Sequence, residues 1–364
     1  MIFVILALLL FASWYVPFRI ASALGKKRYW PFSVLMALAV LGYLAVIMTG
    51  FYVNPSPVVS YLFVGLGLLF LFSSYLFTLT LLAHLLSLPL KKFPRKKVAW
   101  GTIAVAFLLV GWAYLQALSF TVTETTIEVK NLKAPVTLIH LPDLHLGPSR
   151  DIRYLTEVLA VVEEYRPDFV VYNGDLVDGN SALRAEVFDL FKAVGVPQYF
   201  TTGNHEYYVN VDAVVGFAQD AGVIPLRSER VEAFNLNLVG LEYMNADRNA
   251  SSGHTVNDLY MDEELPKIAL NPNLPTLLIH HSPVGIQYAV QAKVDVYLAG
   301  HTHGGQVFPG TALIKERFPY VKGRYGIDGL TLLVSQGAGT FGPKARLGTR
   351  NEIQVVRLTP APSA

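Results

Sequence analysis

The distribution of charge along the chain constrains its fold more than any other feature of the sequence. No aspartate or glutamate occurs before Glu124, and four uncharged runs fill most of the first 118 positions: 1–17, 31–53, 58–90 and 98–118. A membrane-spanning helix needs about 20 predominantly apolar residues. The last three runs reach this length, and the first is near the lower limit. We therefore predict a four-helix transmembrane anchor over residues 1–118.

The first apolar run has an alternative interpretation as a cleaved signal peptide. No basic residue precedes the run, and no convincing small-residue cleavage site follows it. We therefore favour a helix that is retained.

The short loops between the runs predict the orientation of the anchor. Basic residues lie in the first and third loops, and the second loop, 54–57, has no charge. Loops rich in lysine and arginine stay in the cytoplasm. With four spans, the first and third loops share a side, so we expect everything after residue 118 on the extracytoplasmic face of the cell membrane. His84, in the third run, is interpreted as interfacial rather than as part of a proton path.

The remainder of the chain has a different composition, with 20 basic against 27 acidic residues and a formal net charge of −7. This balance disfavours binding along a nucleic-acid backbone, so we expect no nucleic-acid partner. The chain has no cysteine, which excludes disulfides, thiolate zinc sites and a cysteine nucleophile.

After residue 118, short apolar runs alternate with polar helical patterns. Helical spacing occurs at 151–165 and 182–194, between strands expected at 121–129, 136–141, 168–172 and 198–202. This alternation predicts βαβ units and a parallel sheet. Further strands follow without long helices between them, at 236–241, 276–279, 294–298, 330–335 and 352–358. They predict a second, more antiparallel sheet facing the first, and residues 359–364 are expected to form a frayed tail.

Five short polar motifs lie just past the ends of predicted strands: Asp143-Leu144-His145, Gly174-Asp175, Gly203-Asn204-His205-Glu206, His281-Ser282-Pro283 and Gly300-His301-Thr302-His303. Each motif alone is weak. Five of the nine histidines lie in these motifs, however, and a sixth, His280, adjoins one of them. Ligands of α/β sheets bind at the carboxyl ends of strands. Oxygen and imidazole donors of this number can hold two divalent metal ions, the usual apparatus for in-line displacement at phosphorus.

With these motifs, residues 121–358 resemble the calcineurin-like metallophosphoesterase superfamily. The likeness is greatest to its membrane-associated bacterial branch, whose last histidine motif reads as residues 300–306 do, Gly-His-Thr-His-Gly-Gly-Gln. It extends to residues 203–208, 335–339 and 351–353. The resemblance implies an α/β fold for residues 119–358, a four-layer sandwich of two facing mixed sheets flanked by helices. Pro142 and Gln336 depart from the family pattern, which often has serine and arginine there.

The resemblance also implies a ligand set for two metal ions. One ion would be held by Asp143, His145, Asp175 and His303, and the other by Asp175, Asn204, His281 and His301, with Asp175 bridging. The mixed oxygen and nitrogen donors suit Mn, Fe or Zn. His281 is preferred to His280 because it matches the family spacing His-x-Pro and because alternation along the strand places His280 on the other face.

Such a pair of cations would lower the pKa of a bridging water and neutralise the phosphoryl oxygens during attack by the resulting hydroxide. His205, adjacent to a ligand, is predicted to protonate the leaving oxygen, with an orienting role as the alternative. Glu206 is expected to orient a ligand. No role is assigned to the four cations Arg317, Arg324, Lys344 and Arg346.

The sequence thus predicts a membrane-anchored phosphoesterase acting on phosphate monoesters, diesters or diphosphates. Its expected partners are the lipid bilayer and a phosphate-ester substrate, for which lipid-linked and envelope compounds are candidates. The alternatives are a nuclease or nucleotide phosphodiesterase, and a non-catalytic membrane scaffold that keeps the fold.

Overall fold

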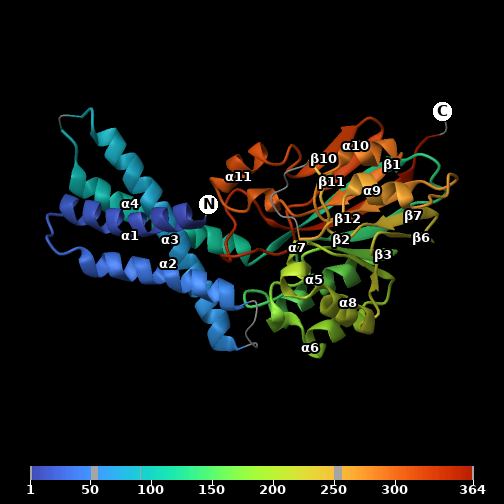
Figure 1. Ribbon diagram of the computed structural model, residues 1–364, viewed down its shortest axis with the longest axis horizontal. Coiled ribbons are helices and arrows are strands. Elements are labelled where there is room, and N and C mark those ends of the chain that lie inside the picture. The colour runs from blue at the N-terminus through green and yellow to red at the C-terminus, as the bar shows by residue number, and fades with distance from the viewer. Residues whose placement is uncertain (1, 51–55, 91, 250–255, 363–364) are drawn as a thin grey trace. The chain divides into compact units, whose positions relative to one another are not determined.

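The computed structural model describes residues 2–50, 56–90, 92–249 and 256–362 (Figure 1). Within these ranges the chain divides into two compact units. The first contains residues 2–50 and 56–118 together with the segment Gly342–Leu347, and the second contains the remaining described residues.

Four helices build the first unit: α1 (Ile2–Ala23), α2 (Trp30–Gly50), α3 (Pro57–Ser87) and α4 (Arg95–Ala117). Helix α1 contacts each of the other three, and α2 and α4 both contact α3, so the four form a bundle. Among the described residues, three segments are long and apolar enough to cross a membrane: Trp30–Ile47, Pro57–Ser87 and Arg95–Ala117. That α1 also crosses stays a prediction.

These helices are apolar around their whole circumference rather than along one stripe. Large apolar side chains point outward on different helices, with Trp30, Tyr61 and Phe107 exposing 65%, 79% and 70% of their surface. A helix without a polar face needs either a protein core or lipid around it. The outward side chains of this bundle therefore match a bilayer.

The second unit contains two six-stranded sheets. The first has the order β1 (Phe120–Val129), β12 (Asn351–Pro360), β2 (Val136–Leu141), β3 (Phe169–Asn173), β4 (Gln198–Thr201) and β5 (Ile224–Pro225). The second has the order β10 (Gly323–Ile327), β11 (Leu330–Val334), β9 (Val296–Ala299), β8 (Thr276–Ile279), β7 (Leu236–Gly240) and β6 (Glu229–Ala233). Both sheets are mixed. Only β12 with β2 pairs antiparallel in the first, whereas β10 with β11 and β6 with β7 do so in the second.

The two sheets face each other across one buried apolar core. Leu138 and Val171 of the first sheet pack in the same cluster as Leu277 and Leu298 of the second. Successive residues of a strand point to opposite faces. Accordingly Leu138 lies in this inner core, whereas its neighbour Ile139 lies in a separate core on the outer face.

Helices cover both outer faces, which completes the four predicted layers (Figure 1). The first sheet is covered by α5 (Ile152–Tyr165), α6 (Ala185–Phe188) and α8 (Val211–Asp220). The second is covered by α9 (Met261–Glu264) and α10 (Ile286–Gln291). Short elements complete the unit: α7 (Asn204–Val209), α11 (Gly310–Leu313), and the 3-10 turns η1 (Asn180–Ala182), η2 (Asp189–Ala193), η3 (Leu265–Lys267), η4 (His303–Gly305) and η5 (Ile314–Glu316).

The helix predicted over 182–194 is wrong in its extent. Only α6 is α-helical there, because Arg184 is extended and a 3-10 turn follows from Asp189. Val187, Phe188 and Phe191 still reach the core, which explains the helical spacing in the sequence. The carbonyl of Phe191 accepts hydrogen bonds from Val194 N and from Gln198 Nε2, which end the turn.

Candidate metal centre

The polar motifs meet where strands end. Asp143 and His145 follow β2, Asp175 follows β3, and Asn204 follows β4 in the first sheet, while His281 and His301 follow β8 and β9 in the second. Within each sheet these strands are parallel, so their carboxyl ends share one edge. The structure brings the predicted side chains together in three overlapping groups: Asp143 with His145 and His303, His145 with Asp175 and His205, and Asp175 with His281 and His301.

In the first group, three donor atoms converge on one point. The Nε2 atoms of His145 and His303 lie 3.1 Å apart, and His303 Nε2 lies 3.3 Å from Asp143 Oδ1. Atoms arranged tetrahedrally at about 2.1 Å from an ion are separated by roughly 3.4 Å. The spacing of these donors therefore fits ligation of one metal ion.

In the third group, the backbone fixes the tautomer of His281. Its Nδ1 lies 2.7 Å from the carbonyl oxygen of Asn173, which can only accept, so Nδ1 carries a proton. Nε2 then faces the site, 3.2 Å from Asp175 Oδ2. In metal-binding histidines, the ring nitrogen that does not bind the metal usually donates a hydrogen bond, which orients the ring.

Three buried polar atoms of the cluster lack a hydrogen-bond partner among the described residues: His145 Nδ1, Asn204 Oδ1 and His281 Nε2. A buried polar atom without a partner is costly, and natural proteins rarely leave one. Asn204 Oδ1 and His281 Nε2 are candidate ligand atoms, and a bound cation would satisfy them. The residues present therefore fit a two-metal site.

The histidines of the cluster differ in their protonation states. Burial lowers the pKa of His145 and of His301 to about 3, so both rings are neutral, the form that binds metals. Burial also opposes the charge on His281, but Asp175 and Asp143 outweigh it and raise its pKa to about 10. A metal ion bound through Nε2 must therefore displace a proton from His281.

The backbone is strained at most of the predicted ligands. Asp143, His145, Asp175, His301 and His303 have positive φ values of 57°, 48°, 51°, 69° and 49°. Few non-glycine residues adopt this left-handed conformation, and those that do cluster at functional sites. The sharp turns after the strands are what aim these side chains at one centre.

Gly203 and Gly300 must be glycine because the Asp175 and Asp143 carboxylates lie against their backbone. A Cβ at Gly203 would overlap Asp175 Oδ1, and a Cβ at Gly300 would lie 2.5 Å from Asp143 Oδ2. No larger residue fits at either position without moving a predicted ligand. This explains the glycine that begins both motifs.

Glu206 orients the loop that carries Asp175 and does not line the cleft. Its carboxylate accepts hydrogen bonds from the backbone N–H groups of Asp175, Leu176 and Gly203, at 2.9, 2.8 and 2.6 Å. Burial and the charge of Asp175 raise the pKa of Glu206 to about 7, whereas these N–H donors lower it. The contacts agree with the predicted orienting role.

His205 is held over the cluster by Asp178, a residue that the sequence reasoning missed. His205 Nδ1 lies 2.9 Å from Asp178 Oδ1, and His205 Nε2 lies 3.8 Å from Asp175 Oδ2. Burial lowers the pKa of His205, but Asp175 and Asp178 outweigh it and raise that pKa to about 9. Asp178 stands three residues after Asp175 in the same motif loop, and this spacing was the available signal.

A cleft of about 510 Å³ opens onto the cluster. Its polar wall includes His145, Asp175, Asn204, His205, His301 and His303. The apolar part of its lining, which we call the apolar wall, consists of Leu313, Ile314, Phe318 and Phe341. Volumes of this size are typical of small-molecule sites.

The four unassigned cations lie in different places. Arg317 lines the cleft, whereas Arg324 donates to the carbonyl of Thr126, 2.9 Å away in β1. Lys344 and Arg346 lie in Gly342–Leu347, which belongs to the helical unit.

The neighbouring His280 is outside the cluster. Its Nδ1 lies 2.8 Å from the carbonyl oxygen of Ser282 and 2.9 Å from Tyr297 Oη.

Comparison with known proteins places the site in a family context. The family described as calcineurin-like phosphoesterase matches residues 136–305, which contain all seven predicted ligands. A cow (Bos taurus) protein described as "Transmembrane protein with metallophosphoesterase domain" is 32% identical over 259 residues, which cover 65% of this chain and 57% of that protein. A zebrafish (Danio rerio) protein of the same description is 29% identical over 366 residues, covering 92% and 82%.

A bacterial relative, "Uncharacterized protein YpbG" of Bacillus subtilis, is 31% identical over 238 residues, covering 62% of this chain and 82% of that protein. The chain thus spans less than two thirds of the length of the cow relative. The similar proteins include animal as well as bacterial ones, so assignment to a bacterial branch stays a prediction.

Proposed function

The chain belongs to the calcineurin-like phosphoesterase family, and from this premise we propose that it is a membrane-anchored hydrolase of phosphate esters with two divalent metal ions in its site. The observation that carries the proposal is the convergence of buried aspartate, histidine and asparagine donors at the edge of both sheets. The alternative of a non-catalytic scaffold is disfavoured by the same convergence. No feature of the cleft favours a nuclease.

We assign one ion to Asp143, His145, Asp175 and His303, and the other to Asp175, Asn204, His281 and His301. Bound divalent cations supply a hydroxide nucleophile near neutral pH and offset the negative charge that develops on phosphoryl oxygens. The donor set suits manganese, iron or zinc better than magnesium or calcium. We propose manganese for the first activity screen.

His205 is proposed to protonate the leaving oxygen. Asp178 accepts a hydrogen bond from His205 Nδ1, which fixes the ring and leaves Nε2 facing the cleft. The proton on Nε2 is then available to an ester oxygen as its bond to phosphorus breaks. Arg317, which lines the same cleft, is proposed to contact the phosphate.

The substrate is proposed to be amphiphilic, a lipid-linked phosphate or diphosphate. The apolar wall of the cleft supports this, because Leu313 and Phe341 expose 64% and 47% of their surface at its rim. An alkyl chain lying on this wall would bury that surface. We propose that hydrolysis takes place on the extracytoplasmic face, an orientation that the basic loops of the anchor favour.

The test is hydrolysis of a chromogenic phosphodiester, bis(4-nitrophenyl) phosphate, by the full-length protein with manganese. Asp175→Asn should reduce the rate by at least about a hundredfold, because it removes the shared carboxylate, and weakening even an outer partner of a metal costs about 10–100-fold. Asp220→Asn, an exposed carboxylate on α8, is the matched control and should leave the rate unchanged. Equal rates for wild type and Asp175→Asn would refute the proposed metal chemistry.

A further inference from the structure

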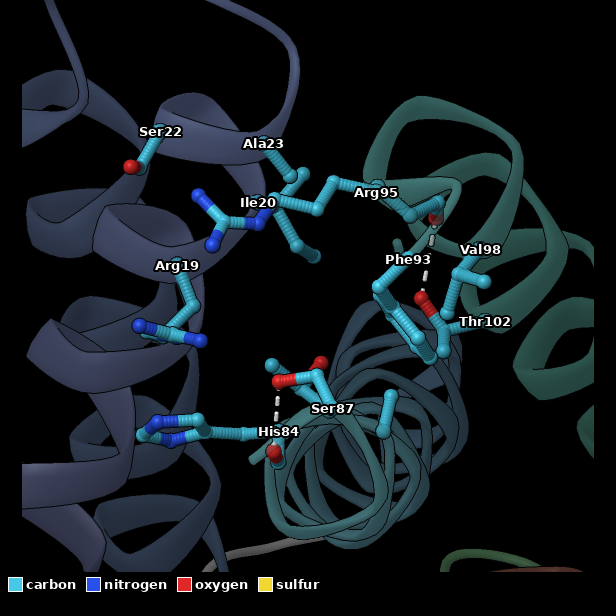
Figure 2. Close-up of a pocket in the computed structure, with 13 residues that line it drawn as sticks. Arg19, Ile20, Ser22, Ala23, His84, Ser87, Phe93, Arg95, Val98 and Thr102 are labelled. Atoms are coloured by element: carbon cyan, nitrogen blue, oxygen red, sulfur yellow. Dashed lines mark hydrogen bonds between the residues drawn. The ribbon is translucent and has the colours of Figure 1, made fainter. Parts of the chain in front are cut away.

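The helical unit contains a pocket of its own, separate from the metal centre. It lies where the last turn of α1, the last turns of α3 and the start of α4 meet (Figure 2). Its volume is about 60 Å³, whereas a single water needs roughly 10–15 Å³. The pocket can therefore hold a group of several heavy atoms.

Cationic and imidazole side chains from three helices gather in this pocket. Arg19 comes from α1, His84 from α3 and Arg95 from α4. In Figure 2 their nitrogen atoms lie on the same side of the pocket, and the Arg95 side chain extends from α4 toward α1. Arginine side chains present several N–H donors in a rigid fork, which suits phosphate oxygens.

These cations have no acidic partner within their own unit. Residues 1–118 contain no aspartate or glutamate, and neither does the segment 342–347, Gly-Pro-Lys-Ala-Arg-Leu. Two arginines held in one small pocket repel each other unless an anion lies between them. Any such anion must come from outside the helical unit.

A buried hydroxyl in the same pocket also lacks a partner. Thr80, which lines the pocket, is only 7% exposed, and its Oγ1 has no hydrogen-bond partner among the residues that the structure describes. Hydroxyls within a helix commonly bond to the carbonyl four residues earlier, as Ser73 does to Leu69 in α3. Thr80 does not, so its hydroxyl can donate to a ligand.

His84 is already oriented. Its Nδ1 lies 2.6 Å from the hydroxyl oxygen of Tyr15 on α1, which joins the two helices and leaves Nε2 for another contact. The hydroxyl of Ser87 donates to the carbonyl of His84, 2.6 Å away, so it can offer only lone pairs to the pocket. The donors of the pocket are therefore Arg19, Arg95 and Thr80, joined by His84 when its Nε2 carries the proton.

We propose that this pocket binds a phosphate anion, presented by an anionic phospholipid headgroup or as a free ion. It lies at the end of the bundle that carries the two basic loops, where headgroup phosphates of a bilayer would be found. Basic pockets between membrane helices bind anionic lipid headgroups by the same chemistry. The site is independent of the metal centre and of the proposed hydrolysis.

The experiment measures binding of dioleoyl phosphatidylglycerol to the delipidated full-length protein in detergent by native mass spectrometry. The double variant Arg19→Gln with Arg95→Gln should weaken this binding by at least about tenfold, since each lost charge-assisted hydrogen bond has an appreciable cost. The matched control is Lys26→Gln with Lys27→Gln, which removes the same charge from exposed residues outside the pocket. It should change the affinity less than about threefold.

Thr80→Val tests the pocket without changing any charge, and it should weaken binding by about threefold or more. Elution volume and helical circular dichroism establish that each variant is folded.

Inorganic phosphate at millimolar concentration distinguishes the two possible sources of the phosphate group. If it binds and displaces the lipid, the ligand is a free anion, and if it does not, the ligand is the headgroup. The proposal is overturned if phosphatidylcholine binds as tightly as phosphatidylglycerol, or if the two double variants behave alike.

Discussion

The backbone at the metal-binding residues is in a conformation that their side chains do not favour. Five of the seven proposed ligands have positive φ, and each such residue costs about 1 kcal/mol or more. The surrounding backbone must therefore hold them in place. Glu206 does this for the Asp175 loop through its hydrogen bonds to backbone N–H groups.

Gly203→Ala should disrupt the metal centre through Asp175. The new methyl group would overlap the Asp175 carboxylate, so either the carboxylate moves or the turn opens. We expect manganese affinity to fall by at least about tenfold. Isothermal titration calorimetry of the full-length protein with manganese measures this affinity. Gly195→Ala, where a Cβ would meet nothing within 4 Å, should bind as wild type, and equal affinities for both variants would contradict the role of Gly203.

Asp178→Asn should shift the pH dependence of hydrolysis. A group that donates a proton stops working as the pH rises through its pKa, and the Asp178 carboxylate raises the pKa of His205. Removing it lowers that pKa, so the alkaline limb of the rate profile should move down by about one pH unit. Asp189→Asn removes an exposed carboxylate and is the control. If the alkaline limb does not move in Asp178→Asn, His205 is not the proton donor whose pKa sets that limb.

At the scale of elements, α11 contributes Leu313 and η5 contributes Ile314 to the apolar wall of the cleft. Leu313→Ser replaces one apolar side chain of this wall with a small polar one. Because Leu313 is exposed, the fold should tolerate the change. For a phosphodiester with a long alkyl chain we expect KM to rise about five- to tenfold, because less apolar surface is buried. KM for a short-chain diester should not change. Ile224→Ser, an exposed apolar residue of β5, is the control.

A rise in KM for both substrates would indicate that Leu313 does not contact the alkyl chain. The comparison of chain lengths therefore separates a specific wall from a general loss of activity. It also tests the amphiphilic substrate independently of metal binding.

Most strands and their order along the chain could be predicted, because buried strands leave short apolar runs. Strand β3 lies within one residue of its predicted limits, and α5 starts just after its capping residue, Asp151. Edge strands β6 and β10 were missed, since their half-exposed residues leave no clear alternation. Helix α8 was also missed, although Asn210 accepts a hydrogen bond from Ala213 N at its start and is a visible capping signal.

The candidate site was predictable by residue type, but not in its geometry. Each predicted ligand could be placed at a strand end by its motif. The left-handed turns, the partner of His205 and the apolar wall depend on contacts between segments far apart in the sequence. Asp178 in particular reaches His205 only because β3 and β4 are neighbours in the sheet.

At the scale of the whole molecule, the side of the membrane on which each unit lies can be tested directly. The chain has no cysteine, so a single introduced one reports its own exposure. Asn273→Cys, on the surface of the second unit, should react with a membrane-impermeant maleimide in intact cells. Lys27→Cys, in the first basic loop, should react only after permeabilisation. Labelling in the opposite order would reverse the predicted orientation.

Strand β12 lies between β1 and β2, although its residues come more than two hundred positions after β1. A growing polypeptide therefore releases β1 long before its neighbour exists, and an unpaired strand is prone to join the wrong chain. Closing this sheet requires a contact between distant segments, which makes assembly slow. Ribosomes that stall before residue 351 would leave behind an incomplete product whose open border is a target for chaperones and proteases.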